Sequence, residues 1–383
     1  MDEKKTKVYM IGPSLKTQGG ISSVLDIYNK NFRELLNLRF ISSYYGKSRV
    51  LDIILFAAAV IRVIWANLSG DGIFHIHVAS NGSYLRKSIL AKICMAFRHR
   101  VILHVHGAMF DKFMEGAGQK KRGRIIALFN KADSVVVLSE SWFSYFKRFV
   151  AAEKLHVIYN PSSTFRAGSI RRSRTGSTRC GEAGPTRCSE ARSAGSSETV
   201  SVGIIETEMI QILFMGRFGR RKGVYDLIQA AAKLKDLPFR LNLYGDGEIS
   251  EVRKLVEEKQ LQEIVIVNGW VSHSDISRIY ENADVMVLPS YAEGLPMSLL
   301  EAIGEGLPVV STCVGGIPEA VEEGRNGFLI DQGDVDALAE RLRTLITSPE
   351  LVDRMGQESL TIAREKFSTD RIGQQLQQLY QSL

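Results

Sequence analysis

Two glutamates that stand eight positions apart, Glu293 and Glu301, are the strongest chemical signal in this sequence. They begin and end the segment Glu-Gly-Leu-Pro-Met-Ser-Leu-Leu-Glu. The apolar run 285–288 before it is typical of a buried parallel strand, and a glycine and a proline interrupt the chain before a helix expected near Met297. Because ligands of open α/β sheets bind at the carboxyl ends of strands, where new helices direct free N–H groups, the segment predicts a site for a hydroxyl-rich, phosphate-bearing ligand.

A basic loop bracketed by glycines, residues 216–223, follows another predicted strand and precedes a predicted helix. Arg217 and Lys222 in this loop can supply positive charge to a diphosphate, the arginine through its planar fork and the lysine as a point charge. A solvated turn remains the alternative interpretation of the loop.

Gly19 and Gly20 lie between the first predicted strand and the first predicted helix. Their missing side chains allow a ligand to approach the backbone closely, although a simple tight turn would need the same residues. The segment lacks the Gly-Lys-Ser/Thr of a phosphate-binding P-loop and the GxGxxG pattern of dinucleotide sites.

Two His-x-His pairs, His75/His77 and His104/His106, end two early strands, and each pair projects to one face of its strand. A metal site is disfavoured because no carboxylate or cysteine stands at an obvious ligand spacing. His106 differs from the other three in that a glycine follows it directly and leaves the peptide open to a ligand. We therefore expect His106 to contact a sugar.

Predicted strands alternate with predicted helices along the chain, which indicates two parallel sheets wound with helices. Between the two sets, residues 166–200 are rich in Ser, Arg and Gly and nearly lack large apolar side chains, so we expect a disordered insert. The predicted strands are 7–11, 72–78, 100–105, 134–138, 155–158, 211–215, 240–244, 264–268, 285–288 and 308–311.

Charge is distributed unevenly. Residues 1–200 contain 31 Lys+Arg and 14 Asp+Glu, whereas residues 201–383 contain 18 and 28. The basic first half suggests an anionic partner such as a membrane surface or an acidic acceptor. Nucleic acid is disfavoured because no nucleic-acid motif accompanies the charge. The four cysteines form no CxxC pair, which favours a reducing compartment.

The segment Leu51–Leu68 is strongly apolar but is interrupted by Asp52, Arg62 and Asn67. A membrane-spanning helix is disfavoured, because charged residues are costly within a bilayer. A buried domain helix is the expected structure, and an interfacial helix with Trp65 near lipid headgroups is the alternative.

Four features in this order resemble family 4 of the retaining nucleotide-sugar glycosyltransferases, which have the GT-B architecture. They are the Gly19-Gly20 loop, His106-Gly107, the basic loop 216–223, and Glu293-x7-Glu301 followed by Gly-Gly-Ile-Pro-Glu at 315–319. The resemblance covers nearly the whole chain except 166–200. It implies an α/β fold with two Rossmann-like, doubly wound parallel-sheet domains that face each other across a cleft.

The resemblance also implies roles for residues. Arg217 and Lys222 would hold the donor diphosphate, Glu301 the ribose hydroxyls and Glu293 the transferred sugar. Gly20 would meet the diphosphate from the other domain, His106 would bond the sugar near its reacting carbon, and the base would lie near Trp270 and Val271. The implied catalytic residues are His106, Arg217, Lys222 and Glu293. The implied donor-binding residues are Gly19, Gly20, Arg217, Lys222, Val271, Glu293, Gly294, Leu295, Pro296, Met297 and Glu301. No cofactor or metal is expected.

The expected organisation is an N-terminal acceptor-side domain (1–165), the insert (166–200), a C-terminal nucleotide-sugar-binding domain (201–369) and a helix that returns to the first domain (370–383). The expected function is transfer of a hexose from a nucleoside diphosphate sugar, such as a UDP- or GDP-hexose, to a lipid-linked saccharide in exopolysaccharide or surface polysaccharide synthesis. The expected location is cytoplasmic, at the inner face of the membrane.

Three alternatives stay open. The acceptor could be soluble, as in disaccharide synthesis. A sugar-nucleotide epimerase shares the architecture, although Glu-x7-Glu is not expected in one. A sensor or scaffold that binds nucleotide sugars without turning them over would keep the donor pocket and lose acceptor chemistry. The base, the sugar and the linkage depend on a few contacts that vary within one fold, so the sequence leaves them open.

Overall fold

The computed structural model describes residues 6–46, 48–70, 72–165, 209–271 and 273–383, so the predicted insert 166–200 lies outside the described residues. Two six-stranded sheets, both parallel throughout, make up its centre. The first has the order β2-β1-β3-β4-β5-β6 and the second β12-β11-β10-β7-β8-β9. The predicted α/β fold with two doubly wound sheets is therefore confirmed.

The first sheet carries nearly continuous apolar strands. All seven residues of β3 are buried, as is every residue of β4 after its first, which is expected for strands covered by helices on both faces. Its strands are β1 (Lys7–Gly12), β2 (Leu38–Ser42), β3 (Gly72–Val78), β4 (Arg100–Val105), β5 (Ser134–Val137) and β6 (Leu155–Val157). Its helices are α1 (Gly20–Asn31), α2 (Arg49–Leu68), α3 (Asn81–Ala96), α4 (Phe110–Glu115), α5 (Gln119–Lys131) and α6 (Glu140–Phe146), with a 3₁₀ turn at Ala152–Lys154.

The second sheet is built in the same way. Its strands are β7 (Ile210–Met215), β8 (Phe239–Tyr244), β9 (Val265–Val267), β10 (Val285–Leu288), β11 (Val309–Thr312) and β12 (Gly327–Ile330). Its helices are α7 (Val224–Ala232), α8 (Ile249–Glu258), α9 (His273–Glu281), α10 (Met297–Gly304), α11 (Ile317–Ala320) and α12 (Val335–Ile346), with a 3₁₀ turn at Arg220–Lys222.

All ten predicted strands are present, and their ends differ from the prediction by at most one residue. The edge strands β2 and β12 were not predicted. β12 begins with Gly327, where a Cβ would lie 2.0 Å from the Val309 carbonyl oxygen of β11, so this position requires glycine. In a sequence, a glycine at this place is typical of a turn, and the strand was therefore missed.

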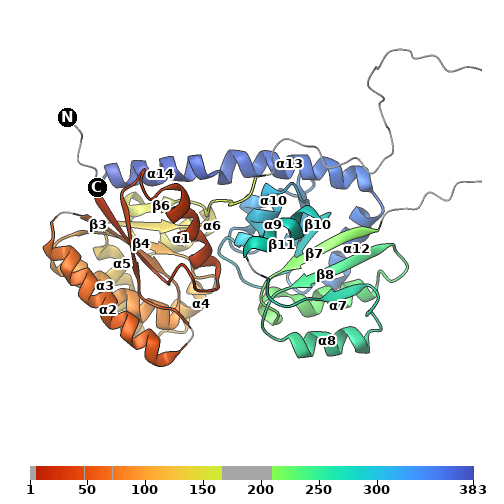
Figure 1. Cartoon of the computed structure of the whole chain (residues 1–383), viewed down its shortest axis with the longest axis horizontal. Coiled ribbons are helices and arrows are strands. Elements are labelled where there is room, and N and C mark those ends of the chain that lie inside the picture. The colour runs from red at the N-terminus through yellow and green to blue at the C-terminus, as the bar shows by residue number, and fades with distance from the viewer. Residues whose placement is uncertain (1–5, 47, 71, 166–208, 272) are drawn as a thin grey trace, which may run out of the picture.

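Two helices join the halves. α13 (Pro349–Phe367) and α14 (Thr369–Gln381) run along one side of both sheets, from the second to the first (Figure 1). α14 packs against the first sheet, where a Cβ at Gly373 would lie 3.0 Å from the Phe32 ring and Tyr380 Oη lies 2.8 Å from His75 Nδ1. The predicted return of the C-terminal helix to the first domain is confirmed.

The expectation of a buried helix at 51–68 is wrong. α2 presents one face to the first sheet, where Ala59, Val63 and Ala66 are buried, but its other face is exposed. A sheet covers only one side of a helix packed on it, and the described residues place no further layer over α2. By length and composition alone α2 could cross a membrane, and 22% of its most apolar window is buried.

Candidate active site

A cleft of about 720 Å³ lies between the two domains, at the carboxyl ends of both sheets. All twelve residues that the sequence singled out as donor-binding or catalytic line it. The N-terminal domain contributes Gly19, Gly20 and His106. The C-terminal domain contributes Arg217, Lys222, Val271, Glu293, Gly294, Leu295, Pro296, Met297 and Glu301. The structure thus brings together residues nearly three hundred positions apart, while the role of each stays a prediction.

The two domains approach closely at the floor of the cleft. A Cβ at Gly294 would lie 3.4 Å from the His106 carbonyl oxygen, and one at Gly20 would lie 3.9 Å from Met297 Cγ. Asn160 Nδ2, in the segment that leaves the first sheet, donates to the Leu295 carbonyl at 2.8 Å. The loop at 293–297 is therefore held from both domains.

Lys222 and Glu293 form an ion pair in the wall of the cleft. Lys222 Nζ lies 2.6 Å from Glu293 Oε1, and the two side chains are 12% and 6% exposed. The Ser290 hydroxyl donates to the same carboxylate oxygen at 2.8 Å, and Arg221 Nη1 lies 3.5 Å from it. Lys222, Ser290 and Arg221 all contact this one oxygen, Oε1. The orientation of the Glu293 carboxylate is therefore fixed before any ligand binds.

Glycines make this pairing possible. Gly223 has φ +70°, and a Cβ there would lie 1.9 Å from the Pro289 carbonyl oxygen, so the basic loop can pack against the end of β10 only without a side chain. Gly315 has φ +55°, and its Cβ would lie 1.9 Å from the Glu293 carbonyl oxygen. Gly316 N–H donates to the Gly294 carbonyl at 2.6 Å. Gly315 and Gly316 therefore support the Glu293–Gly294 turn.

Three of the four basic side chains of this loop, Arg217, Arg221 and Lys222, line the cleft and differ in how firmly they are held. Arg217 is 71% exposed and has only a long contact, 3.8 Å, with Asp246. Arg221, which the sequence did not single out, donates to the Ala292 carbonyl at 2.9 Å and lines the cleft. Its only signal in the sequence is its place within a basic run. The loop thus offers one exposed guanidinium and two anchored cations to an anion in the cleft.

Glu301 lies on the second turn of α10 and is 6% exposed. Burial raises the pKa of its carboxyl to about 7, although hydrogen bonds from Tyr280 and Ser163 oppose the shift. Tyr280 Oη lies 3.0 Å from Glu301 Oε2. A carboxyl held near its midpoint at neutral pH can become a strong acceptor when hydroxyl donors reach it. No pattern in the sequence pointed to Tyr280.

Four histidines line up between the first sheet and its covering helices. His77 Nδ1 lies 2.8 Å from His106 Nε2, and His75 Nε2 lies 3.0 Å from His104 Nδ1. Ring nitrogens of His75, His77 and His104 lie within 4.8 Å of one another, close enough to hold a metal ion, but the bonds above already engage a nitrogen of each ring. Burial lowers the pKa of His106 to about 3 and that of His77 well below its usual value, so both rings are neutral at neutral pH.

The protonated nitrogens can be deduced. His77 Nε2 lies 3.4 Å from Met10 Sδ, and a thioether can only accept a hydrogen bond. His77 therefore carries its proton on Nε2 and accepts at Nδ1, which makes His106 Nε2 the donor. A neutral His106 then has a bare Nδ1. Since His106 lines the cleft, it offers an acceptor and no donor to a ligand.

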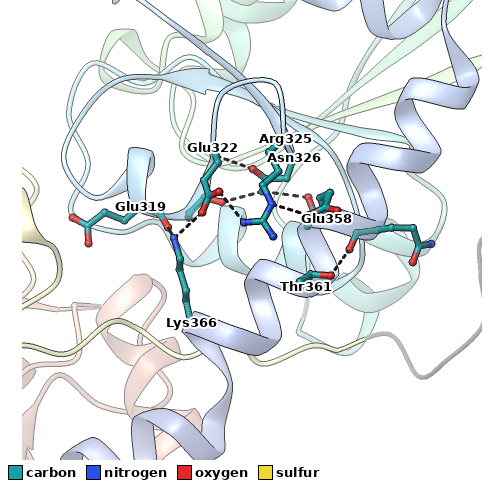
Figure 2. Close-up of polar contacts among 10 residues, drawn as sticks. Glu319, Glu322, Arg325, Asn326, Glu358, Thr361 and Lys366 are labelled. Carbon is teal, nitrogen blue, oxygen red and sulfur yellow. Dashed lines mark hydrogen bonds and ion pairs between the residues drawn. The ribbon is translucent and has the colours of Figure 1, made fainter.

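The segment 315–319 ties the site to the rest of the molecule. Glu319 Oε1 accepts from the Glu140 N–H of the N-terminal domain at 2.6 Å. The loop after α11 is bound to α13 by ion pairs (Figure 2): Lys366 Nζ lies 2.9 Å from Glu322 Oε1, and Arg325 bridges Glu322 and Glu358 at 2.8 and 2.7 Å. One short segment thus connects the wall of the cleft with α13.

A second, smaller cleft of about 400 Å³ adjoins the first and shares Glu293 and Ala108 with it. Trp142 and Tyr145 of α6 and Tyr291 of the C-terminal domain line it, together with Asp111. The shared wall means that a molecule in the second cleft can reach one held beside Glu293.

Residues 198–360 match the profile of the family described as glycosyl transferases group 1. Over 188 residues the chain is 34% identical to a Salmonella typhimurium glycosyltransferase assigned by name to colanic acid biosynthesis (WcaL), covering 45% of each chain. Over 171 residues it is 32% identical to the N-acetyl-alpha-D-glucosaminyl L-malate synthase of Bacillus anthracis, covering 44% of each. The match thus spans less than half the length of these curated relatives.

Among solved structures, Anabaena Alr3699/HepE in complex with UDP is similar over 99% of this chain and 100% of its own, with a TM-score of 0.72 and 20% identity. At that identity the likeness shows the fold alone. The architecture is GT-B, and residues 198–360, less than half of the chain, are similar to the glycosyl transferases group 1. The predicted GT-B fold is confirmed, and the match over residues 198–360 agrees with the predicted family.

Proposed function

We propose that this protein is a retaining glycosyltransferase that transfers a hexosyl group from a nucleoside diphosphate sugar to a saccharide acceptor. The observation that carries the proposal is the buried Lys222–Glu293 pair, flanked by Arg217 and Arg221 in the cleft that Glu301 also lines. Cations for a diphosphate, a fixed carboxylate for a sugar and a second carboxylate for ribose hydroxyls stand along one wall of one cleft. The similarity of residues 198–360 to the glycosyl transferases group 1 adds to this support.

The chemistry follows from where charge develops. When the bond between the anomeric carbon and the diphosphate oxygen breaks, its electron pair stays on the diphosphate and positive charge spreads over the sugar ring. Lys222 and the arginines stabilise the first charge, and the acceptor at His106 Nδ1 and the Glu293 carboxylate favour the second. The acceptor hydroxyl attacks from the face that the diphosphate leaves, and its proton passes to the departing phosphate oxygen.

Glu293 serves here as an orienting group. Its carboxylate already accepts from Lys222 and Ser290, which lowers its availability as a nucleophile. In a double displacement the nucleophilic carboxylate must stand very close to the scissile carbon and become covalently glycosylated. Trapping a glycosyl adduct on Glu293 would contradict the assignment.

The acceptor is proposed to be a lipid-linked saccharide of exopolysaccharide or surface polysaccharide assembly, held in the second cleft. Tyr291, 37% exposed, offers an aromatic ring to a sugar, and Asp111, which lines the same cleft, offers an acceptor for its hydroxyls. The basic N-terminal half and the Salmonella relative, whose name places it in colanic acid synthesis, support this acceptor class. A soluble acceptor is the alternative.

The test is donor consumption. Purified protein is mixed with UDP-, GDP- and ADP-sugars, alone and with a membrane extract, and release of the nucleoside diphosphate is measured. We expect slow hydrolysis of one donor alone and faster release with extracted lipids. Release stimulated equally by soluble saccharides would favour the soluble acceptor. A donor that binds but is never consumed would favour a nucleotide-sugar-binding assembly protein that is not an enzyme.

A further inference from the structure

α2 carries an apolar stripe on the face turned away from the protein. Exposed residues recur at spacings of three and four, as they do on one side of a helix. Ile53, Ile61 and Trp65 are 69%, 67% and 73% exposed. The exposed stripe consists of Val50, Ile53, Ile54, Ala57, Ile61, Ile64, Trp65 and Leu68. Soluble proteins rarely leave so many large apolar side chains together in water, which indicates that something covers them.

The neighbouring helix extends this surface. α3 packs along α2, and Figure 1 shows the two helices side by side at the outer edge of the N-terminal domain, away from the second sheet. Leu85, Ile89 and Phe97, on and just after α3, are 63%, 39% and 43% exposed. We call the α2 stripe with these three residues the α2–α3 face.

The inner side of α2 holds the helix in place. Ala59, Val63 and Ala66 belong to the core beneath the sheet. Near the start of the helix, Asp52 Oδ1 accepts from the N–H groups of Tyr45 and Gly46 at 2.8 and 2.9 Å. A helix anchored in this way can lie on a bilayer surface but cannot cross it without uncovering the sheet.

Positive charge surrounds the α2–α3 face. Residues 48–100 contain seven Lys+Arg and two Asp+Glu, and α5 beyond them contains five Lys+Arg and no acid. Arg49 and Arg62 are exposed on opposite flanks of the α2 stripe, and Asp52 is already committed to the loop above. A second copy of the same face would bring like charges together, whereas anionic lipid headgroups would complement them.

The α2–α3 face is also connected to the cleft. The Thr17 hydroxyl, which belongs to a residue that lines the large cleft, donates to the Tyr45 carbonyl at 3.1 Å, and Asp52 holds Tyr45 from the α2 side. The first turn of α2 therefore lies close to the N-terminal wall of the cleft. A bilayer surface that binds α2 would therefore lie close to the cleft.

We propose that the α2–α3 face docks the protein on an anionic lipid bilayer, with α2 lying flat, its apolar stripe among the acyl chains and its arginines at the headgroups. Docking itself stands independently of the proposed function. One consequence of docking does rest on the proposed function, namely that the cleft receives its acceptor from the lipid surface. An amphipathic helix with apolar and basic sides is the kind of element that binds at such interfaces.

The experiment is co-flotation of the whole protein with vesicles in the absence of any nucleotide. Mixed phosphatidylcholine–phosphatidylglycerol vesicles are compared with pure phosphatidylcholine vesicles. The wild type is expected to float with the anionic vesicles, less at high salt. The variant Ile53→Gln/Ile61→Gln/Trp65→Gln should lose at least about tenfold in partitioning. Trp65 emission should shift to the blue on binding, and a Trp65→Phe variant should lack that shift.

The matched control is Leu35→Gln/Met209→Gln, which removes exposed apolar side chains elsewhere, 47% and 42% exposed, and should float as the wild type does. Thermal melting and nucleotide binding report whether each variant is folded. Equal flotation of wild type and triple variant would overturn the proposal. So would a wild type that ignores both vesicles and forms a dimer that the triple variant cannot form. Since no donor is present, either result leaves the proposed transfer reaction untouched.

Discussion

Replacing Lys222 tests how the cleft holds a diphosphate. Lys222→Met removes the ammonium and keeps most of the stem, which packs near Gly216, where a Cβ would lie 3.5 Å from Lys222 Cε. The variant should bind nucleoside diphosphates more weakly and bind the free nucleoside as the wild type does. The reason is that the ammonium contributes to the diphosphate alone.

The structure bounds the size of the loss. A charge-assisted hydrogen bond contributes about 1.5–3 kcal/mol, which corresponds to roughly tenfold to a hundredfold in affinity. Lys222 is already paired with Glu293 at 2.6 Å in the free protein, so binding exchanges or shares a partner rather than creating one. We therefore expect the lower half of that range. Glu293→Gln, which frees the ammonium, should leave diphosphate affinity unchanged or raise it.

Isothermal titration of UDP, GDP and ADP, each beside its nucleoside, measures these differences. The double variant Lys222→Met/Glu293→Gln completes a cycle that isolates the coupling between the two side chains. Thermal melting is the control, because removal of the lysine leaves Glu293 buried with only Ser290 and Arg221 beside it. Equal diphosphate affinity in a folded Lys222→Met protein would refute the placement of the diphosphate.

Four further expectations concern the rest of the site. His106→Ala should lower turnover more than free nucleotide binding, and equal losses in kinetics and titration would make His106 structural. Nucleotide affinity should fall as the pH drops through about 7, by at most about tenfold per pH unit, because ribose hydroxyls favour the ionised form of Glu301. Calorimetric titrations in buffers of different ionisation heat should show that binding releases a proton at neutral pH. Binding that does not depend on pH would contradict this expectation. The same raised pKa means that the folded state holds this proton longer than the unfolded state, so the free energy of unfolding should fall as the pH rises from 4.5 to about 7, and Glu301→Gln should flatten that slope. Gly315→Ala should cost about 1–3 kcal/mol of unfolding free energy and weaken donor binding, since its Cβ would collide with the Glu293 carbonyl; denaturation at wild-type midpoint would refute the reasoning.

Apolar runs predicted the centre of both sheets well, because a strand buried on both faces needs such a run whatever surrounds it. The edge strands β2 and β12 were missed and α2 was predicted poorly, because their surroundings are not visible in the sequence. β12 starts at a glycine that its neighbour β11 demands, and a helix as apolar as α2 is expected in a core unless its outer surroundings are known. The apolar sequence of α2 predicts that the helix avoids water, and the structure shows that only its inner face is covered by the protein.

Motifs in the sequence identified the residues that line the site, but they did not identify the residues with which those side chains form hydrogen bonds and ion pairs. Lys222 and Glu293 were given separate roles because they stand 71 positions apart, and the fold joins them in one ion pair. Tyr280 belongs to no motif and still holds Glu301. The His-x-His pairs suggested strand ends, whereas the proton positions that make His106 an acceptor depend on Met10, which is distant in sequence and has no chemical signature of its own.

The most direct test of the account follows the anomeric configuration of the sugar released from a consumed donor. Each UDP-, GDP- and ADP-sugar is incubated with the protein and membrane extract, and the first product is observed by NMR before it can mutarotate. We expect that one nucleotide series is consumed, that the product keeps the donor's anomeric configuration, and that Lys222→Met slows the reaction. Inverted configuration, or no donor consumed by a protein that binds its nucleotide, would contradict these expectations.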